Sequence, residues 1–243
     1  MTNRSKGWEA NSGGSAKASW DYRPVMDRVA HEADAQIGGE TGMGLYIDES
    51  AFAKKGEHSV GVARQWNGRL GKQDNCQVGV FGALGRGDRV TPIDARLYLP
   101  KEWTDDPRRC ERADVPRSEQ FHRTKLELAQ QITRSARRFG VRFAWVGVDG
   151  GYGNSLEFLQ SLQAQGETLV ADIHSDRHIY LTAPAPYLAP QGVGRPRVRH
   201  HSDAQPIEVR KWVKKQPASA WHRKTLRSAT KGKLTVEVLH RRV

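Results

Sequence analysis

Apolar residues recur every third or fourth position in three segments of the chain. Residues 22–37 carry such a stripe, and a Gly-Gly pair ends it. Residues 118–140 carry a second stripe that ends at Gly140, with basic residues on the opposite face. A third, shorter stripe spans residues 155–166. The spacing predicts a helix over each segment.

Short apolar or alternating runs between these segments are typical of strands. The run Leu45, Tyr46 and Ile47 ends on Asp48, and the turn GRGD follows the strand-like residues 76–84. The predicted strands cover residues 45–48, 59–66, 76–84, 89–100, 142–149 and 168–173. We expect the early strands to pair antiparallel in sequence order and the later ones to join by crossover helices. This order predicts an α/β fold with a mixed sheet and flanking helices.

The amino-acid composition changes at both ends of the chain. Residues 1–19 are polar and rich in Gly, Ser and Asn, so we expect a disordered tail. After His174 the chain becomes rich in Pro, Gly and Arg, and two further strands are expected at about 221–227 and 233–241. We therefore predict a core domain over residues 20–174 and a β-rich attachment over 175–243.

Charge is the strongest signal in the composition. The 243 residues hold 39 Lys and Arg against 27 Asp and Glu, a net charge of +12. Such a chain attracts polyanions, of which DNA and RNA are the most common. The alternative that it is a basic protein without a specific nucleic-acid function stays open. Two cysteines without metal-ligand spacing disfavour zinc. No membrane helix or secretory signal is visible, so we expect a cytoplasmic protein.

Asp48 and Asp149 each end a predicted buried strand. Burying a carboxylate costs several kcal/mol unless it is compensated, and a hard divalent cation such as Mg²⁺ compensates it. Carboxylates that converge from neighbouring strands can hold two metal ions about 3.5–4 Å apart on a scissile phosphate. The alternative is that each acid only caps a following turn or helix.

At these acids the sequence resembles the DDE-superfamily transposases of bacterial insertion sequences. The resemblance runs from Trp20 to Val243 and rests on long motifs, among them GLYIDESAFAKKGEHSVGVARQW, DARLYLPKEWTDDPRRC and RFAWVGVDGGYG. It continues through QPASAWHRKTLRSATKGKLTVEVLHRRV in the attachment. The resemblance implies an RNase H-like core, interrupted by a β-rich insertion that begins near residue 175.

The resemblance also implies a chemistry: cleavage and strand transfer at transposon ends with Mg²⁺ or Mn²⁺. Asp48 in IDES matches the first catalytic Asp, and Asp149 in VDGGYG matches the second. The third carboxylate, a Glu on a helix after the insertion, has no match, and Glu237 fits a solvated strand face instead. We expect a partial transposase that is truncated at both ends and inactive alone. We expect it to bind transposon ends and target DNA in the nucleoid, where it could form a homo-oligomer.

Five basic residues between the predicted early strands are candidates for DNA phosphate contacts: Lys54, Lys55, Arg64, Arg69 and Lys72. For the two lysines an exposed turn without a ligand is equally compatible. Tyr152 could stack on a base or pack in the core, whereas Trp66, Trp103 and Trp145 favour the core.

Two other functions stay open. One is a DNA-binding remnant without catalysis. The other is an RNase H-like nuclease that uses another acid, such as Asp94 or Glu157.

Overall fold

The computed structural model describes residues 22–184, 187–188, 200–201, 204–229 and 232–241. The predicted tail over residues 1–19 lies outside them. The chain divides into two compact units, Met1–Gly147 and Val148–Val243, which are described separately. The boundary predicted near residue 174, between core and insertion, stays a prediction.

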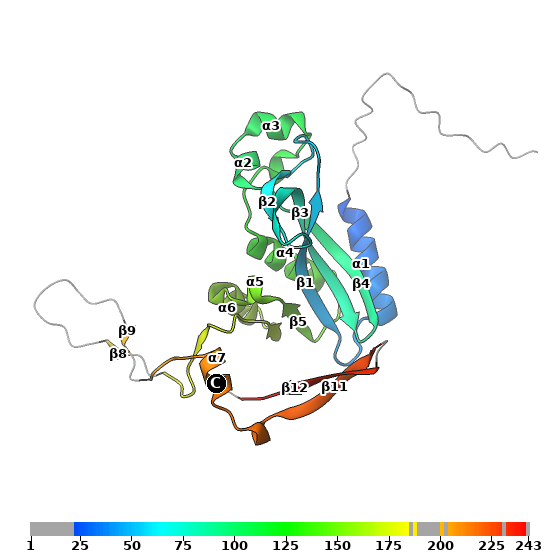
Figure 1. Cartoon of the computed structure of the whole chain (residues 1–243). Coiled ribbons are helices and arrows are strands. Elements are labelled where there is room, and N and C mark those ends of the chain that lie inside the picture. The colour runs from blue at the N-terminus through cyan, green and yellow to red at the C-terminus, as the bar shows by residue number, and fades with distance from the viewer. Residues whose placement is uncertain (1–21, 185–186, 189–199, 202–203, 230–231, 242–243) are drawn as a thin grey trace, which may run out of the picture. The chain divides into compact units, whose positions relative to one another are not determined.

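The first unit is built on antiparallel strands that pair mostly in sequence order. Strands β1 (Gly44–Ala53) and β3 (Lys72–Arg86) pair over ten residues, and β2 (Ala63–Asn67) and β4 (Arg89–Leu97) pair with successive stretches of β3 (Figure 1). The sheet order is β2-β3-β1-β5-β6, with β4 beside β3, where β5 is Trp145–Val148 and β6 is Leu169–Ala171. This order confirms the expected α/β class with a mixed sheet and is consistent with the RNase H-like arrangement.

Strand β1 is longer than predicted. It does not end at Asp48, because the pairing with β3 continues to Ala53 opposite Cys76. Three consecutive polar residues after Ile47 conceal this continuation, because they interrupt the apolar run: Asp48, Glu49 and Ser50. Leu45, Ile47 and Ala51 are buried on one face, whereas Tyr46 and Asp48 are exposed on the other.

Helices cover the buried face and one edge of this sheet. Helix α4 (Lys125–Arg138) begins at Thr124, which exchanges capping-box hydrogen bonds with Glu127. Ile132 of α4 lies so close to Gly82 of β3 that a Cβ there would overlap it. Helix α1 (Arg23–Ile37) runs along β4 and buries Ala30 and Ala33 (Figure 1). The predicted helix over 22–37 is thus confirmed, and the one over 118–140 begins later than expected.

A small second hydrophobic core lies near strand β2 in this unit. Helices α2 (Lys101–Thr104) and α3 (Pro107–Arg112) enclose Leu99, Trp103, Cys110 and Val115. Trp103 is 1% exposed, and its indole N–H donates to the carbonyl of Val62 at 2.8 Å. The core position predicted for Trp103 is confirmed, but the one predicted for Trp66 is wrong, because Trp66 is 56% exposed.

The second unit contains short elements and a hairpin. The predicted helix over 155–166 is α6, and the two strands predicted near the C-terminus form the antiparallel pair β11–β12. Its elements are α5 (Gly150–Gly153), α6 (Leu156–Ala164), β6 (Leu169–Ala171), β7 (His178–Ile179), β8 (Tyr187–Leu188), β9 (His200–His201), β10 (Ile207–Glu208), α7 (Val209–Lys214), β11 (His222–Ala229) and β12 (Gly232–Val238). Two 3-10 turns complete the chain, Arg117–Glu119 in the first unit and Ala218–Ala220 in the second. No helix in the described ranges is long and apolar enough to cross a bilayer.

Asp94 is a buried carboxylate that ties α1 and α4 to β4. It is 3% exposed and accepts from the Arg23 guanidinium at 2.7 Å and from that of Arg96 at 3.1 Å. Arg96 also donates to the hydroxyl of Ser135 on α4. Burial by itself lowers the pKa of Arg23, but the hydrogen bond and charge of Asp94 raise it overall. A nuclease built on Asp94 is therefore contradicted, because both arginines already hold this carboxylate.

We predict that Asp94→Ala lowers the free energy of unfolding by about 3 kcal/mol, because two partly buried arginines lose their counter-charge. Urea unfolding followed by circular dichroism measures this. Asp88→Ala, in the exposed β3–β4 turn, removes the same charge and should leave the midpoint almost unchanged. Equal midpoints for the two variants would show that the Asp94 network contributes little.

Candidate catalytic carboxylates and basic surface

Asp48 lies in the middle of β1, on the exposed face of the sheet. It is opposite Phe81 of β3, and one of its oxygens, Oδ1, accepts from the backbone N–H of Glu49 at 2.7 Å. The neighbouring Glu49 points to the other side of the sheet, where its carboxylate accepts a hydrogen bond from Lys125 Nζ at 2.5 Å. Strand alternation therefore separates the two acids, and Asp48 is the one on the open face.

Asp149 is the first residue after β5 (Trp145–Val148) and belongs to the second unit. Its Oδ1 accepts from the backbone N–H groups of Gly151 at 2.9 Å and Tyr152 at 3.4 Å. It is thus the N-cap of the short helix α5, so the capping role left open by the sequence is present. Both of these hydrogen bonds are accepted by Oδ1, and the residue is exposed.

The turn that carries Asp149 packs tightly against the following strand. A Cβ on Gly153 would overlap the carbonyl oxygen of Asp172, and the N–H of Asp172 donates to Val148 at 3.0 Å. Tyr152 is 2% exposed and packs on Phe158, with ring centroids 6.0 Å apart. Core packing, and not base stacking, is therefore the role of Tyr152.

The donor set suits a hard cation, because both candidate aspartates expose carboxylate oxygens. Within the described part of the chain, however, no three His, Cys, Asp or Glu side chains gather as a ligand group. Glu237 on β12 is exposed and pairs with Arg223 at 3.5 Å, as expected of a solvated strand face. Glu157 is exposed in the first turn of α6.

The predicted phosphate-binding residues lie in β2 and near both of its ends. Lys54 and Lys55 follow β1 in a loop that Asn75 fixes by donating to the carbonyls of Lys54 and Gly56 at 2.9 and 3.0 Å. Arg69 and Lys72 are exposed at the β2–β3 turn.

Arg64 shares the face of Asp48. It pairs with Asn75, Asp48 pairs with Phe81, and these two β3 residues are an even number of positions apart. The strand register therefore places the Arg64 side chain on the open face of the sheet.

Comparisons with known proteins agree with these features. The model of a family described as DDE superfamily endonuclease matches residues 15–233. A protein of Microchaete diplosiphon, named probable transposase for insertion sequence element IS701, is 30% identical over 138 residues. That match covers 56% of this chain and 33% of the relative, so the chain spans about a third of the relative's length. No solved structure matches the chain.

We predict that Gly153→Ala destabilises the turn that carries Asp149 by about 1–3 kcal/mol, because the added methyl group must displace the Asp172 carbonyl. Amide hydrogen exchange at Asp172, whose N–H donates to Val148, should become faster. Gly56→Ala is the matched control, since a Cβ at Gly56 meets nothing within 4 Å. Unchanged exchange in Gly153→Ala would contradict the tight packing of this turn.

Proposed function

The chain belongs to the DDE superfamily endonuclease family, and we propose that it carries part of a transposase active site, in which Asp48 and Asp149 bind Mg²⁺ or Mn²⁺. The reaction proposed is cleavage and strand transfer of DNA at the ends of an insertion sequence. The probable transposase of Microchaete diplosiphon supports this function, although the match covers a third of that protein.

The register of β1 and β5 is the observation that carries the proposal. Within the first unit, the backbone N–H of Ala144 donates to the carbonyl of Met43 at 2.8 Å, and Trp145 packs against Gly44. Gly147 in turn faces the ring of Tyr46. The two segments therefore run side by side in the same direction as far as Gly147. In the sequence, Asp48 follows Tyr46 by two residues, and Asp149 follows Gly147 by two residues.

The residues of this chain would position the metal and the DNA and would not themselves react with the phosphodiester. A divalent cation, when bound, activates the attacking water or 3′-hydroxyl and stabilises the leaving oxygen. Asp48 would hold it from the rigid centre of a ten-residue strand pair. Asp149 would hold it through Oδ2 while its Oδ1 stays fixed by two backbone N–H groups. Neither carboxylate then needs to reorganise when the metal enters.

We further infer that the 243 residues alone hold the metal weakly and cleave little DNA. Two-metal sites need at least one more converging carboxylate, and the described residues contain no cluster of three candidate ligands. The same observation favours a second candidate function, a DNA-binding transposase remnant without catalysis. The DNA partners would be transposon ends and target, held by Lys54, Lys55, Arg64, Arg69 and Lys72 in the nucleoid, with a homo-oligomer on the DNA.

Asp149→Asn and Asp149→Ala separate the metal-binding role from the capping role. Asn is about as good an N-cap as Asp, so we predict that Asp149→Asn keeps the thermal midpoint but loses metal binding. Asp149→Ala should lose both, with a capping cost of about 1 kcal/mol. Asp48→Asn should also lose metal binding. The measurement is the broadening of NMR signals near Asp48 by Mn²⁺.

A DNA cleavage assay with Mg²⁺ or Mn²⁺ completes this test. The wild-type chain should show little cutting, and Asp176→Asn, an exposed acid outside the proposed site, should bind Mn²⁺ like the wild type. Mn²⁺ binding that survives both Asp48→Asn and Asp149→Asn would overturn the proposed site. Robust cutting abolished by Asp48→Asn would instead show that a third ligand is present in this chain.

A further inference from the structure

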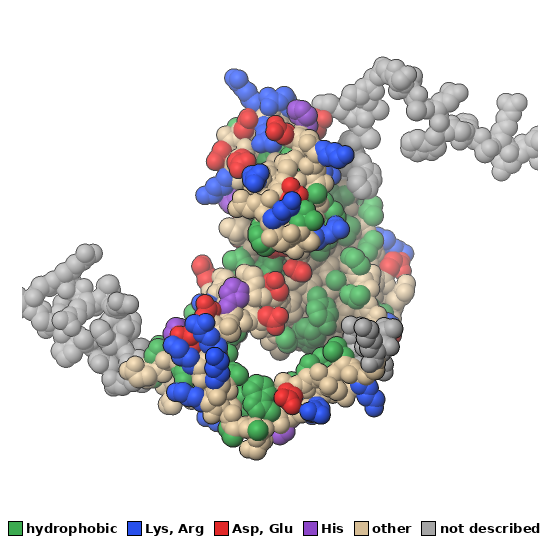
Figure 2. Space-filling view, in the orientation of Figure 1, with side chains coloured by type: hydrophobic (Ala, Val, Ile, Leu, Met, Phe, Trp, Pro, Cys, Tyr) green, Lys and Arg blue, Asp and Glu red, His purple; other side chains and the backbone are tan. Residues whose placement is uncertain are grey.

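A cavity of about 760 Å³ opens between β2, the loop after β1 and helices α2 and α3. It lies within the first unit, beside the small core around Trp103. Four basic side chains line it, together with two glutamates: His58, Arg64, Arg109, Arg112, Glu57 and Glu102. The basic residues outnumber the acids in this lining, and Figure 2 shows Lys and Arg side chains interspersed with Asp and Glu over this end of the unit.

Arg109 is held in a fixed position at the wall of this cavity. Its guanidinium lies over the ring of Trp103, 4.1 Å from the centroid, and donates to the carbonyls of Glu57 at 3.1 Å and Val62 at 3.3 Å. Trp103 is itself buried and donates to the same Val62 carbonyl. A guanidinium ordered in this way loses little further conformational entropy when it binds an anion.

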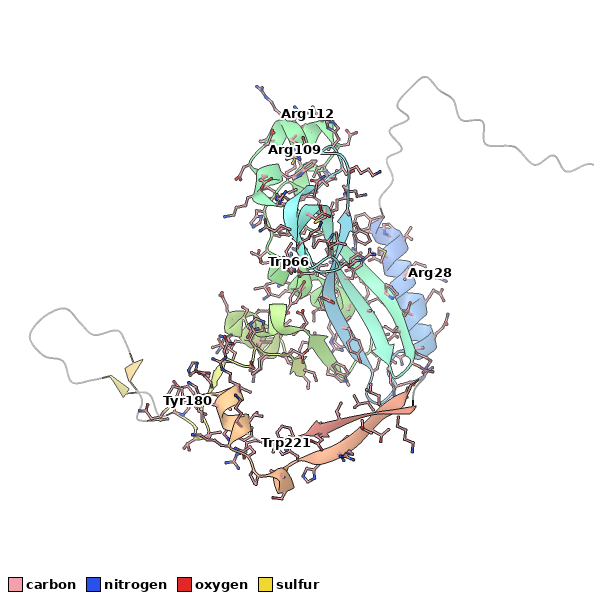
Figure 3. The ribbon with its side chains drawn as sticks, viewed as in Figure 1. Arg28, Trp66, Arg109, Arg112, Tyr180 and Trp221 are labelled. Carbon is pink, nitrogen blue, oxygen red and sulfur yellow. The ribbon has the colours of Figure 1, made fainter. Side chains whose placement is uncertain are left out.

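The arginines that line the cavity are not held by salt bridges in the ranges that the structure describes. Among the described residues, no carboxylate forms a salt bridge with Arg64, Arg109 or Arg112. Glu57 and Glu102 are exposed and pair with none of them. Arg109 and Arg112 both come from α3, where they are labelled in Figure 3. Three guanidiniums around one cavity suit a phosphate, which accepts several charge-assisted hydrogen bonds at once.

The cavity also has a defined relation to Asp48. Arg64 lines it and shares the sheet face of Asp48, and their partners on β3, Asn75 and Phe81, are six positions apart. At the usual rise of a strand this spacing is about 20 Å. Successive phosphates of one DNA strand advance about 3.4 Å along the duplex axis, so the separation corresponds to about six nucleotides.

We propose that this cavity is a second DNA contact, in which Arg64, Arg109 and Arg112 grip a backbone phosphate about six nucleotides from the one held at Asp48. The inference rests on the proposed function, because it takes DNA as the partner. It extends that function to Arg109 and Arg112, which lie outside the basic residues predicted from the sequence. Such a contact fixes the register of the DNA on the sheet without reading its bases.

The test is the salt dependence of duplex binding, measured by fluorescence anisotropy with the full chain and a random-sequence duplex. Loss of the whole phosphate contact should reduce the slope of log K against log salt by about 0.9, and removal of one of the three guanidiniums should reduce it by up to that amount. We expect this reduction in Arg112→Gln and in Arg64→Gln. Arg134→Gln, an exposed arginine of α4, removes the same charge and should leave the slope unchanged. Arg109→Gln also removes a structural contact, so its fold is checked by circular dichroism.

A second readout locates the contact. The indole N–H of Trp103 shares the Val62 carbonyl with Arg109, so duplex DNA should shift its NMR signal in the wild type. In Arg112→Gln the shift should shrink. If the wild type binds no DNA, the proposed function itself fails, and this inference with it. If DNA binds but the slopes of Arg112→Gln and Arg134→Gln agree and the Trp103 signal stays fixed, the cavity contact alone is overturned.

Discussion

The ten-residue pairing of β1 with β3 determines which face each side chain of the first unit occupies. An antiparallel pair alternates strictly, so a slip of one residue would bury Asp48 and expose Ile47. The register is held from one face, where Leu45 and Ile47 are buried and Ile132 presses on Gly82. The apolar core under α4 thus keeps the Asp48 carboxylate on the open face of the sheet.

Asp94 and Asp48 are both carboxylates of the same sheet, but Asp94 is buried and Asp48 is exposed. Asp94 is on the buried face, where two arginines compensate the cost of removing its charge from water. Asp48 is exposed, so water solvates its charge and no buried counter-charge is required. Burial and partners, and not residue type, therefore distinguish the structural acid from the candidate catalytic one.

Much of the fold could be predicted, because helical stripes and apolar runs are local signals. Helix α1 was predicted to within a residue, whereas α4 begins at a Thr124 capping box that the stripe alone does not mark. The end of β1 was wrong because Asp48, Glu49 and Ser50 interrupt its apolar run. The burial of Asp94 could not be predicted, because it depends on Arg23, 71 residues away. Asp48 and Asp149 as a pair came from the family resemblance rather than from pattern.

The two proposed DNA contacts differ in what they require of the protein. A cation at Asp48 needs carboxylates that converge to within a few ångströms, so it depends on residues from several elements. A phosphate grip needs only ordered positive charge, and the Trp103–Arg109 stack supplies it within one small subdomain. Because β3 connects both positions as one continuous strand, their separation is fixed by strand rise rather than by a flexible linker. The proposed grip does not depend on the proposed metal site, so the two proposals can be tested independently.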